Sequence, residues 1–493
     1  MIGIVNRFWK ETIFFSSYLG VLLVCRATDI SAKSYGNDAF SLLYGAKFLE
    51  ARYPSPIYTL FGYGPANLPF GTDGGNLVLF LSVIPAFITS ILVFLIVRKQ
   101  TENKLAPFVG AAVVMGSYPL FSQAVITEVY CLLAMFIAFM CFFLIYDKPK
   151  WAVLFCGLAL STHYITGFVP YVAFIVADKG FRRYWYAPIV VFLTINISYA
   201  FLIPKFYWEP TTSMGSQYLL VFYQVIVALG AGSDWTQVFS GVWQTIRVVI
   251  ISFGIALIPV LLSVRDLKKY SAYVFMVSFP LAFMLVGNWS FRFVQLVPFV
   301  PVVAIMAGLG IDRIRSRHLR FAVLPASLAM MVSMPIFFDV GNTVDESPTT
   351  ARQMYTALEE VDDGSIVIGL KLYESRIGII SDTTGGHVAT IVEYYNRETG
   401  SEIVPFMMNY SLNRESEWVE DGVLREKLEL EGVIVPEFAW IPEKHIYGEG
   451  YMYEYMIGGI AEANPDRDVY YYMIVDLETE RCELVKWDGT TQI

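Results

Sequence analysis

One acidic residue, Glu128, interrupts the long apolar stretch of residues 117–146. A carboxylate at the centre of a membrane-spanning helix costs about 2.5–3.5 kcal/mol, so such residues are rare and usually have a function. This cost disappears where the chain reaches the membrane surface, and there an acid near a helix start also stabilises the helix N-terminus. The position of Glu128 relative to the membrane therefore decides its interpretation.

Two further residues have side chains that could take part in proton transfer. Asp38 begins a segment, residues 37–51, whose apolar spacing predicts a helix, and a positioned carboxylate is a common general base. An acid at that place is equally a normal helix N-cap. His163 lies in the apolar run of residues 151–178, where a histidine either binds a ligand or forms a hydrogen bond between packed helices. The residue types alone leave these alternatives open.

The composition defines the environment of these residues. Of the 493 residues, 56% are hydrophobic, and the mean hydropathy is +0.52, unlike an average soluble protein. Several apolar runs reach the roughly 20 residues that a spanning helix needs. The first run continues to Cys25 without a small-residue cleavage pattern, which predicts a retained helix. We therefore expect a polytopic α-helical membrane protein.

Charge divides the chain near residue 345. Residues 345–493 contain 30 acidic and 11 basic residues, whereas residues 1–344 contain 14 acidic and 24 basic residues. In the acidic part, segments such as VATIVEYYN and RDVYYYMIVDLET predict strands that follow a helix. We therefore expect a transmembrane domain over residues 1–344, and a soluble, extracytoplasmic α/β domain over residues 345–493 that serves acceptor binding or assembly.

The basic residues predict which helix ends face the cytoplasm, because cytoplasmic loops are enriched in Lys and Arg. Six basic clusters all lie on one side if residues 151–178 cross the membrane twice, in a hairpin that turns near residues 161–164. This arrangement predicts about 11 crossings, a cytoplasmic N-terminus and an extracytoplasmic C-terminal domain. The clusters are Arg7/Lys10, Arg98-Lys99/Lys104, Lys148/Lys150, Lys179/Arg182-Arg183, Arg265/Lys268-Lys269 and Arg313/Arg315/Arg317/Arg320.

The same topology gathers the unusual polar residues on the outer face. The first loop, residues 29–75, the turn at Glu128 and the hairpin tip at His163 all lie there. After Asp38 the first loop contains several prolines and glycines in the pattern of a rigid loop. Glu128 is accordingly expected at the outer entrance of a helix.

Two short segments resemble membrane proteins of the GT-C glycosyltransferase superfamily, in a branch related to the protein O-mannosyltransferases. SQAVITEVYCL is similar to a Q-A-x-x-x-E-V-Y segment of that branch, which it matches at Gln123, Glu128 and Tyr130. PIYTLFG, which contains Tyr58, is similar to the P-L-Y-T-L-L-G stretch before the second helix of that branch.

The hairpin segment also resembles this branch, whereas the first loop differs from it. Gly157-Leu158 followed by His163 resembles the branch's G-L-x-x-x-x-H hairpin. In the first loop, GNDAF and RYPSP stand where the branch has a D-S-G-E acidic pair and a His-Pro-Pro-Gly turn. Asp38 is the nearest acidic match, and Asp29 is the alternative.

The resemblance implies an inverting glycosyltransferase that moves a sugar from a polyprenyl- or dolichyl-phosphate carrier to a protein or glycan acceptor on the extracytoplasmic face. In such a reaction Asp38 would take the proton of the acceptor hydroxyl as general base. A cation, Arg292 or Lys205, would stabilise the phosphate leaving group; the alternative for Arg292 is an interfacial side chain without a ligand. The expected substrate-binding residues are Tyr58, Gln123, Glu128, His163 and Arg292.

Missing motifs narrow the chemistry further. The sequence has no Walker A loop, no HExxH and no GxSxG motif, and no metal-ligand spacing, so we expect no cofactor and no metal. The WWDxG signature of oligosaccharyltransferases is absent too. A transporter would place its polar residues at the membrane midplane, and a non-catalytic membrane scaffold would use the first loop only structurally; both stay as alternative hypotheses. The expected partners are membrane lipid, the lipid-linked sugar and the acceptor, not nucleic acid.

Overall fold

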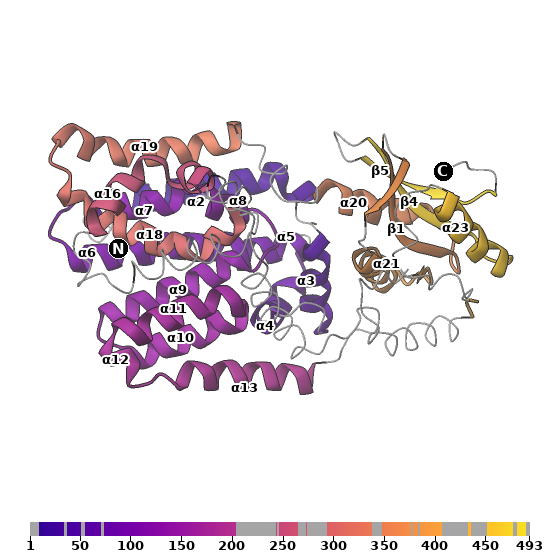
Figure 1. Cartoon of the computed structure of the whole chain (residues 1–493), viewed down its shortest axis with the longest axis horizontal. Coiled ribbons are helices and arrows are strands. Elements are labelled where there is room, and N and C mark those ends of the chain that lie inside the picture. Colours follow the sequence, from indigo (N-terminus) through magenta and orange to yellow (C-terminus); the bar gives the residue numbers. More distant parts are fainter. Residues whose placement is uncertain are drawn as a thin grey trace. The chain divides into compact units, whose positions relative to one another are not determined.

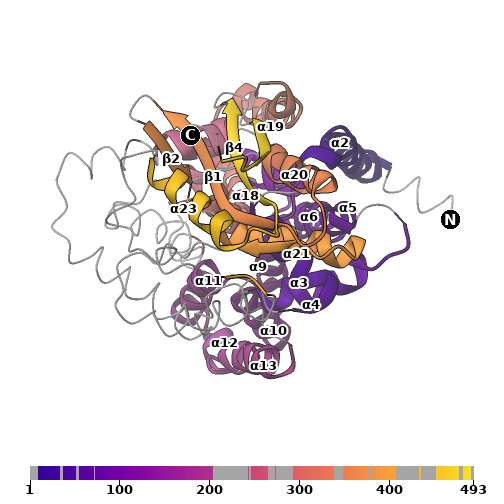
Figure 2. The same cartoon turned by 90° about the vertical axis from the view of Figure 1, so that its right-hand side faces the viewer.

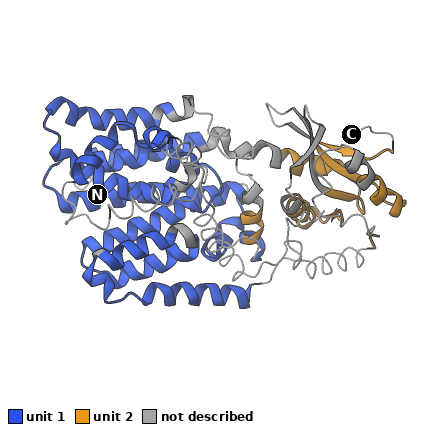
Figure 3. Cartoon of the chain, in the orientation of Figure 1, with its two compact units in different colours: residues 1–34, 46–204, 214–343 blue, residues 35–45, 205–213, 344–493 orange. Residues whose placement is uncertain are grey.

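A computed structural model of the chain describes residues 9–33, 37–50, 55–70, 73–203, 243, 246–264, 273, 293–337, 348–375, 378–382, 385–406, 432–434, 451–476 and 481–489. The chain forms two compact units (Figure 3). Unit 1 comprises residues 1–34, 46–204 and 214–343, and unit 2 comprises residues 35–45, 205–213 and 344–493.

The described part of unit 1 is made of helices and their connections, and seven of these helices begin with a proline at the first or second position (Figure 1). In α4, α6, α7, α8, α10, α13 and α18 a proline occupies one of the first two positions. There the missing N–H costs nothing, because the first N–H groups of a helix have no partner within it. The helices are α2 (Trp9–Lys33), α4 (Pro56–Ala66), α5 (Asp73–Leu77), η1 (Val78–Val83), α6 (Ile84–Gln100), α7 (Ala106–Gly116), α8 (Tyr118–Ala124), α9 (Tyr130–Ile145), α10 (Pro149–Thr162), α11 (Tyr164–Ala177), α12 (Lys179–Arg182), α13 (Ala187–Leu202), η2 (Gly254–Ala256), α16 (Leu257–Ser263), η4 (Phe293–Phe299), α18 (Val300–Gly310), η5 (Ile311–Arg313) and α19 (Arg317–Phe337).

Length and composition fit the predicted membrane class. Within the described residues, three helical stretches are long and apolar enough to cross a bilayer: Gly74–Gln100, Ile246–Ser263 and Leu296–Arg313. Four shorter apolar helices accompany them, at Ala106–Gly116, Tyr130–Ile145, Gly167–Val176 and Ala187–Leu202. The number of crossings, about 11 from the charge pattern, stays a prediction.

The apolar run of residues 151–178 is divided into two helices, as the basic loops predict. α10 ends at Thr162 and α11 begins at Tyr164, so His163 alone joins them. The two helices touch backbone to backbone: a Cβ atom added at Gly167 would lie 2.7 Å from the carbonyl oxygen of Ala159. Both helices also pack against α9 (Figure 1). The predicted turn near residues 161–164 is therefore present, whereas the two membrane crossings of this run stay a prediction.

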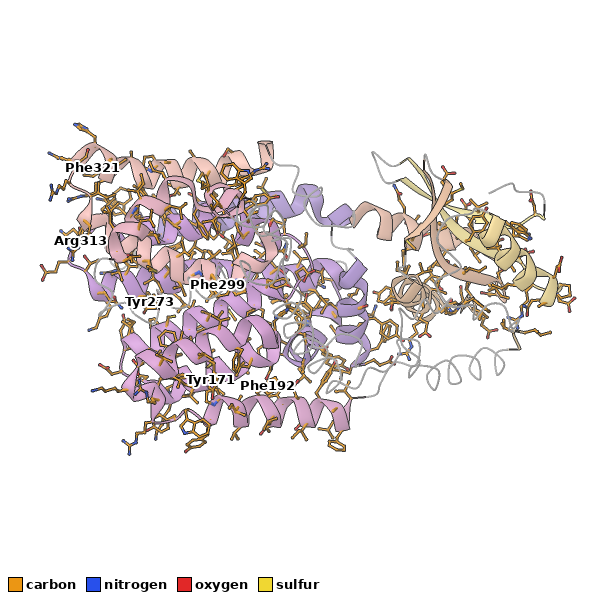
Figure 4. All side chains as sticks on the ribbon, viewed as in Figure 1. Tyr171, Phe192, Tyr273, Phe299, Arg313 and Phe321 are labelled. Carbon is orange, nitrogen blue, oxygen red and sulfur yellow. The ribbon has the colours of Figure 1, made fainter. Side chains whose placement is uncertain are left out.

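Chain segments that carry basic clusters meet at one end of unit 1. Figure 4 labels Arg313 and Phe321 at this end. The start of α2, the end of α6, the end of α9 and η5 are joined there by Arg98 Nη1–Glu11 Oε1 (3.9 Å), Lys99 Nζ over the Tyr146 ring (5.8 Å) and Thr101 Oγ1 to Asp312 Oδ2 (3.1 Å). This grouping agrees with the prediction that the basic clusters lie on one side of the membrane. That this side is the cytoplasmic one stays a prediction.

Unit 2 has a five-stranded mixed sheet with helices packed on it. Strand β1 is central: it pairs in parallel with β4 and β3 and antiparallel with β2, and β4 pairs antiparallel with β5. In Figure 2 β2, β1 and β4 lie next to one another. The strands are β1 (Ile366–Ser375), β2 (Gly378–Asp382), β3 (Val404–Phe406), β4 (Val469–Asp476) and β5 (Arg481–Lys486), and the helices are α3 (Asn37–Phe48, through residue 45), α20 (Pro348–Ala357), η6 (Leu358–Glu360), α21 (Gly385–Thr399) and α23 (Tyr451–Ala463).

The α/β class of this unit agrees with the sequence, but one element was predicted wrongly. VATIVEYYN, expected as a strand, lies in helix α21. Its buried residues include Val388, Ile391, Val392 and Tyr395, which repeat at the three- and four-residue spacing of one helix face. Burial of that face against β1 and β3 outweighs the preference of β-branched residues for strands.

Candidate functional site

Tyr58, Gln123, Glu128 and His163 come from four different places in unit 1. Tyr58 belongs to α4, Gln123 to α8, Glu128 to the turn before α9, and His163 to the joint between α10 and α11. The turn before α9 is held by Ser82 of η1, whose hydroxyl donates to the carbonyl of Ile126 over 2.7 Å. These parts are brought together by a small number of polar and aromatic contacts.

The joint at His163 contacts the start of α9. His163 has an extended backbone (φ −153°, ψ 104°), yet its N–H donates to the carbonyl of Ala159 (3.1 Å) and its carbonyl accepts from the N–H of Gly167 (2.8 Å). Its half-buried ring faces that of Tyr130, with centroids 5.4 Å apart and planes inclined by 36°. The position of His163 is therefore fixed by hydrogen bonds at its N–H and carbonyl groups and by the contact of its ring with Tyr130.

Helix α4 is fastened to the hairpin and to α13 by two buried hydroxyl contacts. The hydroxyl of Ser55, directly before α4, donates to the carbonyl of Thr162 over 2.9 Å. One turn later, the hydroxyls of Thr59 and Tyr199 form a hydrogen bond of 3.2 Å. The start of α4, with Tyr58, thus lies beside the residue that precedes His163.

Tyr58 and Glu128 interact electrostatically. Tyr58 is completely buried. Burial, and after it the negative charge of Glu128, raise the pKa of the Tyr58 hydroxyl well above its usual value, so this tyrosine remains a neutral donor. Glu128 also accepts the N–H of Val129 at the start of α9 over 3.3 Å, which is the contact expected of an acid at a helix N-terminus. The Glu128 carboxylate therefore stabilises the start of α9 and also raises the pKa of Tyr58 in α4.

Three buried polar atoms around this turn have no hydrogen-bond partner within the described part of the chain. They are the Tyr58 hydroxyl, Oε1 of Gln123 and Oγ1 of Thr127. Leaving a buried polar group unpaired costs about 1–3 kcal/mol, and such groups in native proteins need an explanation, for which a bound ligand is one. A polar ligand at this turn would supply the missing partners.

The structure does not describe the side chains of four predicted residues. Arg292 and Lys205 lie outside the described residues. Asp29 belongs to α2 and Asp38 to α3, but both side chains lie outside the described ones. Asp38 is the second residue of α3, so it lies inside the first turn of the predicted helix. The roles of these four residues stay predictions.

Sequence reasoning overlooked the residues that support the site. Ser55 and Thr127 had a local signal, since each is a hydroxyl residue just before a helix start, next to a predicted site residue or its segment. Tyr199 had none, because it lies 140 positions from its partner Thr59. Within the described residues, no group of three His, Cys, Asp or Glu could hold a metal ion; the expected absence of a cofactor stays a prediction.

Comparison with protein-family models gives no match, and comparison with curated protein sequences gives none either. Solved structures do match. ArnT from Cupriavidus metallidurans in the apo state has a TM-score of 0.57 at 12% identity, covering 98% of this chain and 99% of ArnT. The structure of that ArnT bound to undecaprenyl phosphate gives 0.58 at 12% identity, covering 97% and 98%.

A third structure, the Archaeoglobus fulgidus oligosaccharyltransferase tethered with an acceptor peptide, has a TM-score of 0.43 at 13% identity, covering 86% of this chain and 68% of that one, which is too low to establish a shared fold. The likeness to ArnT extends over nearly the whole chain. The chain therefore shares the fold of ArnT, and the predicted fold class, a polytopic α-helical membrane protein with a C-terminal α/β unit, is confirmed.

Proposed function

We propose that this protein is a GT-C-type glycosyltransferase. In this proposal it transfers a sugar from a polyprenyl-phosphate carrier to a protein or glycan acceptor on the extracytoplasmic face of the membrane. The fold shared with ArnT, one structure of which has undecaprenyl phosphate bound, supports this class of donor. The observation that carries the proposal is the polar cluster around Glu128, with its unpaired buried atoms, in a unit made of apolar helices.

The chemistry proposed is an inverting substitution at the anomeric carbon. Asp38 takes the proton of the acceptor hydroxyl, and the hydroxyl oxygen attacks the sugar from the face opposite the carrier phosphate. The phosphate is already a good leaving group, so it requires a cation more than an acid, and Arg292 is the proposed cation. No metal is needed for these steps.

The cluster in unit 1 has a different task in this proposal, namely to hold the donor sugar. The neutral Tyr58 hydroxyl donates a hydrogen bond, whereas Glu128 and Oε1 of Gln123 accept hydrogen bonds from sugar hydroxyls. His163 and Tyr130 supply a polar aromatic wall. The resemblance to the O-mannosyltransferase-like branch makes mannose the first donor sugar to test.

The test is transfer of radiolabelled sugar from crude polyprenyl-phosphate donors to endogenous acceptors, in membranes that contain the protein. We expect Asp38→Asn and Glu128→Gln each to lower transfer at least tenfold, because the first removes the base and the second removes a charge beside the sugar. Donor binding should persist in Asp38→Asn and weaken in Glu128→Gln.

Two exposed acids provide matched controls. Glu102→Gln makes the same change in the loop after α6, and Asp147→Asn lies at a left-handed position (φ 54°) that asparagine also accepts. Both should transfer sugar as the wild type does. If the site variants transfer at the control rate, these residues are not the active site. A wild-type protein that transfers no sugar from any donor would favour the transporter or scaffold hypothesis.

A further inference from the structure

Helix α3 belongs to unit 2 for most of its length, although the chain on both sides of it belongs to unit 1. Residues 35–45 are grouped with the sheet unit, whereas the preceding residues through 34 and those from 46 onward are grouped with the helical unit (Figure 3). A segment of the first loop is therefore held by contacts with the C-terminal part of the chain.

Tyr44 makes these contacts. Its side chain is fully buried, and its ring meets the ring of Tyr394 edge-on, with centroids 6.3 Å apart and an angle of 62°. The guanidinium carbon of Arg397 lies 5.2 Å from the centre of the same ring, in cation–π geometry. The Tyr44 hydroxyl donates to Oε2 of Glu393 over 3.5 Å, at the outer limit of a hydrogen bond.

These three partners occupy one turn of α21, which is itself firmly fixed in unit 2. α21 packs against β1 and β3. At its C-terminal end Asn396 forms two hydrogen bonds with the backbone of Ile403, donating to the carbonyl (2.6 Å) and accepting from the N–H (3.2 Å). Tyr394 and Tyr395 both contact Tyr355 of α20. α21 is therefore a rigid element against which Tyr44 of α3 packs.

We propose that α21 positions α3 through Tyr44, so that unit 2 fixes the location of Asp38 during sugar transfer. This inference rests on the proposed function, in which Asp38 is the general base. Tyr44 lies six residues after Asp38, about 9 Å along the helix at 1.5 Å per residue. A misplacement of about 1 Å in a reacting group lowers a rate as much as a hundredfold. Tyr44 is thus a positioning residue, not a catalytic one.

The choice of variants follows from a second feature of α21. Glu393 and Arg397 also line a cavity of about 430 Å³ in the same unit. A substitution of Glu393 or Arg397 therefore changes that cavity as well as the contact with Tyr44. Variants of Tyr44 itself, which does not line the cavity, separate the two effects.

The contact can be tested without any activity. Tyr44→p-benzoylphenylalanine in the full-length membrane protein, irradiated and digested with trypsin, should form a cross-link to the peptide that ends at Arg397. A cross-link confined to other peptides would overturn the contact, whatever reaction the protein performs.

The positioning role is then tested by the kinetics of transfer. Tyr44→Ala should lower kcat about ten- to a hundredfold and change the KM for the lipid-linked donor less than about twofold, because Tyr44 is not one of the proposed donor-binding residues. Tyr44→Phe keeps both ring contacts and loses only the hydroxyl, so it should restore kcat to within about threefold of the wild type.

Tyr471→Ala is the matched control, since it removes an equally buried tyrosine from strand β4 of the same unit. It should retain the wild-type kcat. Equal kcat values for Tyr44→Ala and the wild type, or an equal loss in Tyr44→Ala and Tyr471→Ala, would overturn the positioning role. A wild type without transfer would overturn the proposed function and this role with it, while the cross-link would still establish the contact.

Discussion

At the scale of single residues, the site places a neutral tyrosine hydroxyl within the electrostatic influence of a carboxylate. Tyr58 is buried and stays protonated because its anion would be both desolvated and close to Glu128. Its hydroxyl has no partner in the described part of the chain. A group that reduces stability in the free protein and donates a hydrogen bond when a ligand arrives is typical of a binding site.

Tyr58→Phe tests this interpretation. The change removes only the unpaired hydroxyl, so the free energy of unfolding should stay equal or rise by about 1 kcal/mol. Transfer should nevertheless fall about tenfold, since the bound sugar loses a donor. A thermal melt and the radiolabel assay measure the two quantities. Unchanged transfer with unchanged stability would leave the hydroxyl without a role in binding.

The residues of the site were only partly predictable from the sequence. Glu128 and His163 could be found because a polar residue in an apolar run is conspicuous. The contacts that hold them, such as Ser55 with Thr162, join residues 107 positions apart and have no local pattern. The lack of a partner for the Tyr58 hydroxyl likewise depends on the residues around it in space, and the hydropathy of the sequence does not reveal them.

At the scale of elements, the hairpin of α10 and α11 depends on one close approach. A Cβ atom at Gly167 would lie 2.7 Å from the Ala159 carbonyl oxygen and 2.9 Å from the Cα of Leu160. Backbone cannot yield as a flexible side chain can, so only glycine fits there. The joint at His163 lies within this contact, because Gly167 also donates to the His163 carbonyl.

Gly167→Ala should therefore destabilise the protein by about 1–3 kcal/mol, the usual cost of overpacking. Gly20→Ala in α2 is the control, because a Cβ atom there meets nothing within 4 Å and alanine favours a helix. Thermal unfolding in detergent, followed by size-exclusion chromatography, compares the two variants. Equal melting temperatures would contradict the close contact.

Helices and turns were predictable where many residues together indicate the same arrangement. The division of residues 151–178 followed from the positions of six basic clusters, and the structure has the break at His163. α21 was missed because its sequence favours a strand residue by residue, while its burial against β1 and β3 favours a helix. A single sequence does not contain that burial.

At the scale of the whole molecule, charge predicts the orientation. Residues 1–344 have an excess of basic residues and residues 345–493 an excess of acidic ones, and the segments with basic clusters meet at one end of unit 1. Basic loops stay in the cytoplasm. The C-terminal unit is then predicted on the opposite side of the membrane.

Reporter fusions test that orientation in a bacterial host. Alkaline phosphatase, which is active only outside the cytoplasm, should be active when fused after residue 493 and inactive when fused after Lys150. Green fluorescent protein should give the reverse pattern at the same two positions. Active phosphatase at Lys150 would invert the topology and remove Glu128 and His163 from the outer face.

The hairpin also constrains how this protein is made. α10 and α11 have 14 residues each, so each is about 21 Å long at 1.5 Å per residue, whereas the hydrocarbon layer is about 30 Å thick. Neither arm alone reaches the roughly 20 residues that a spanning helix needs. We therefore expect the two arms to enter the membrane as a pair, with their contact at Gly167 formed before any substrate is bound.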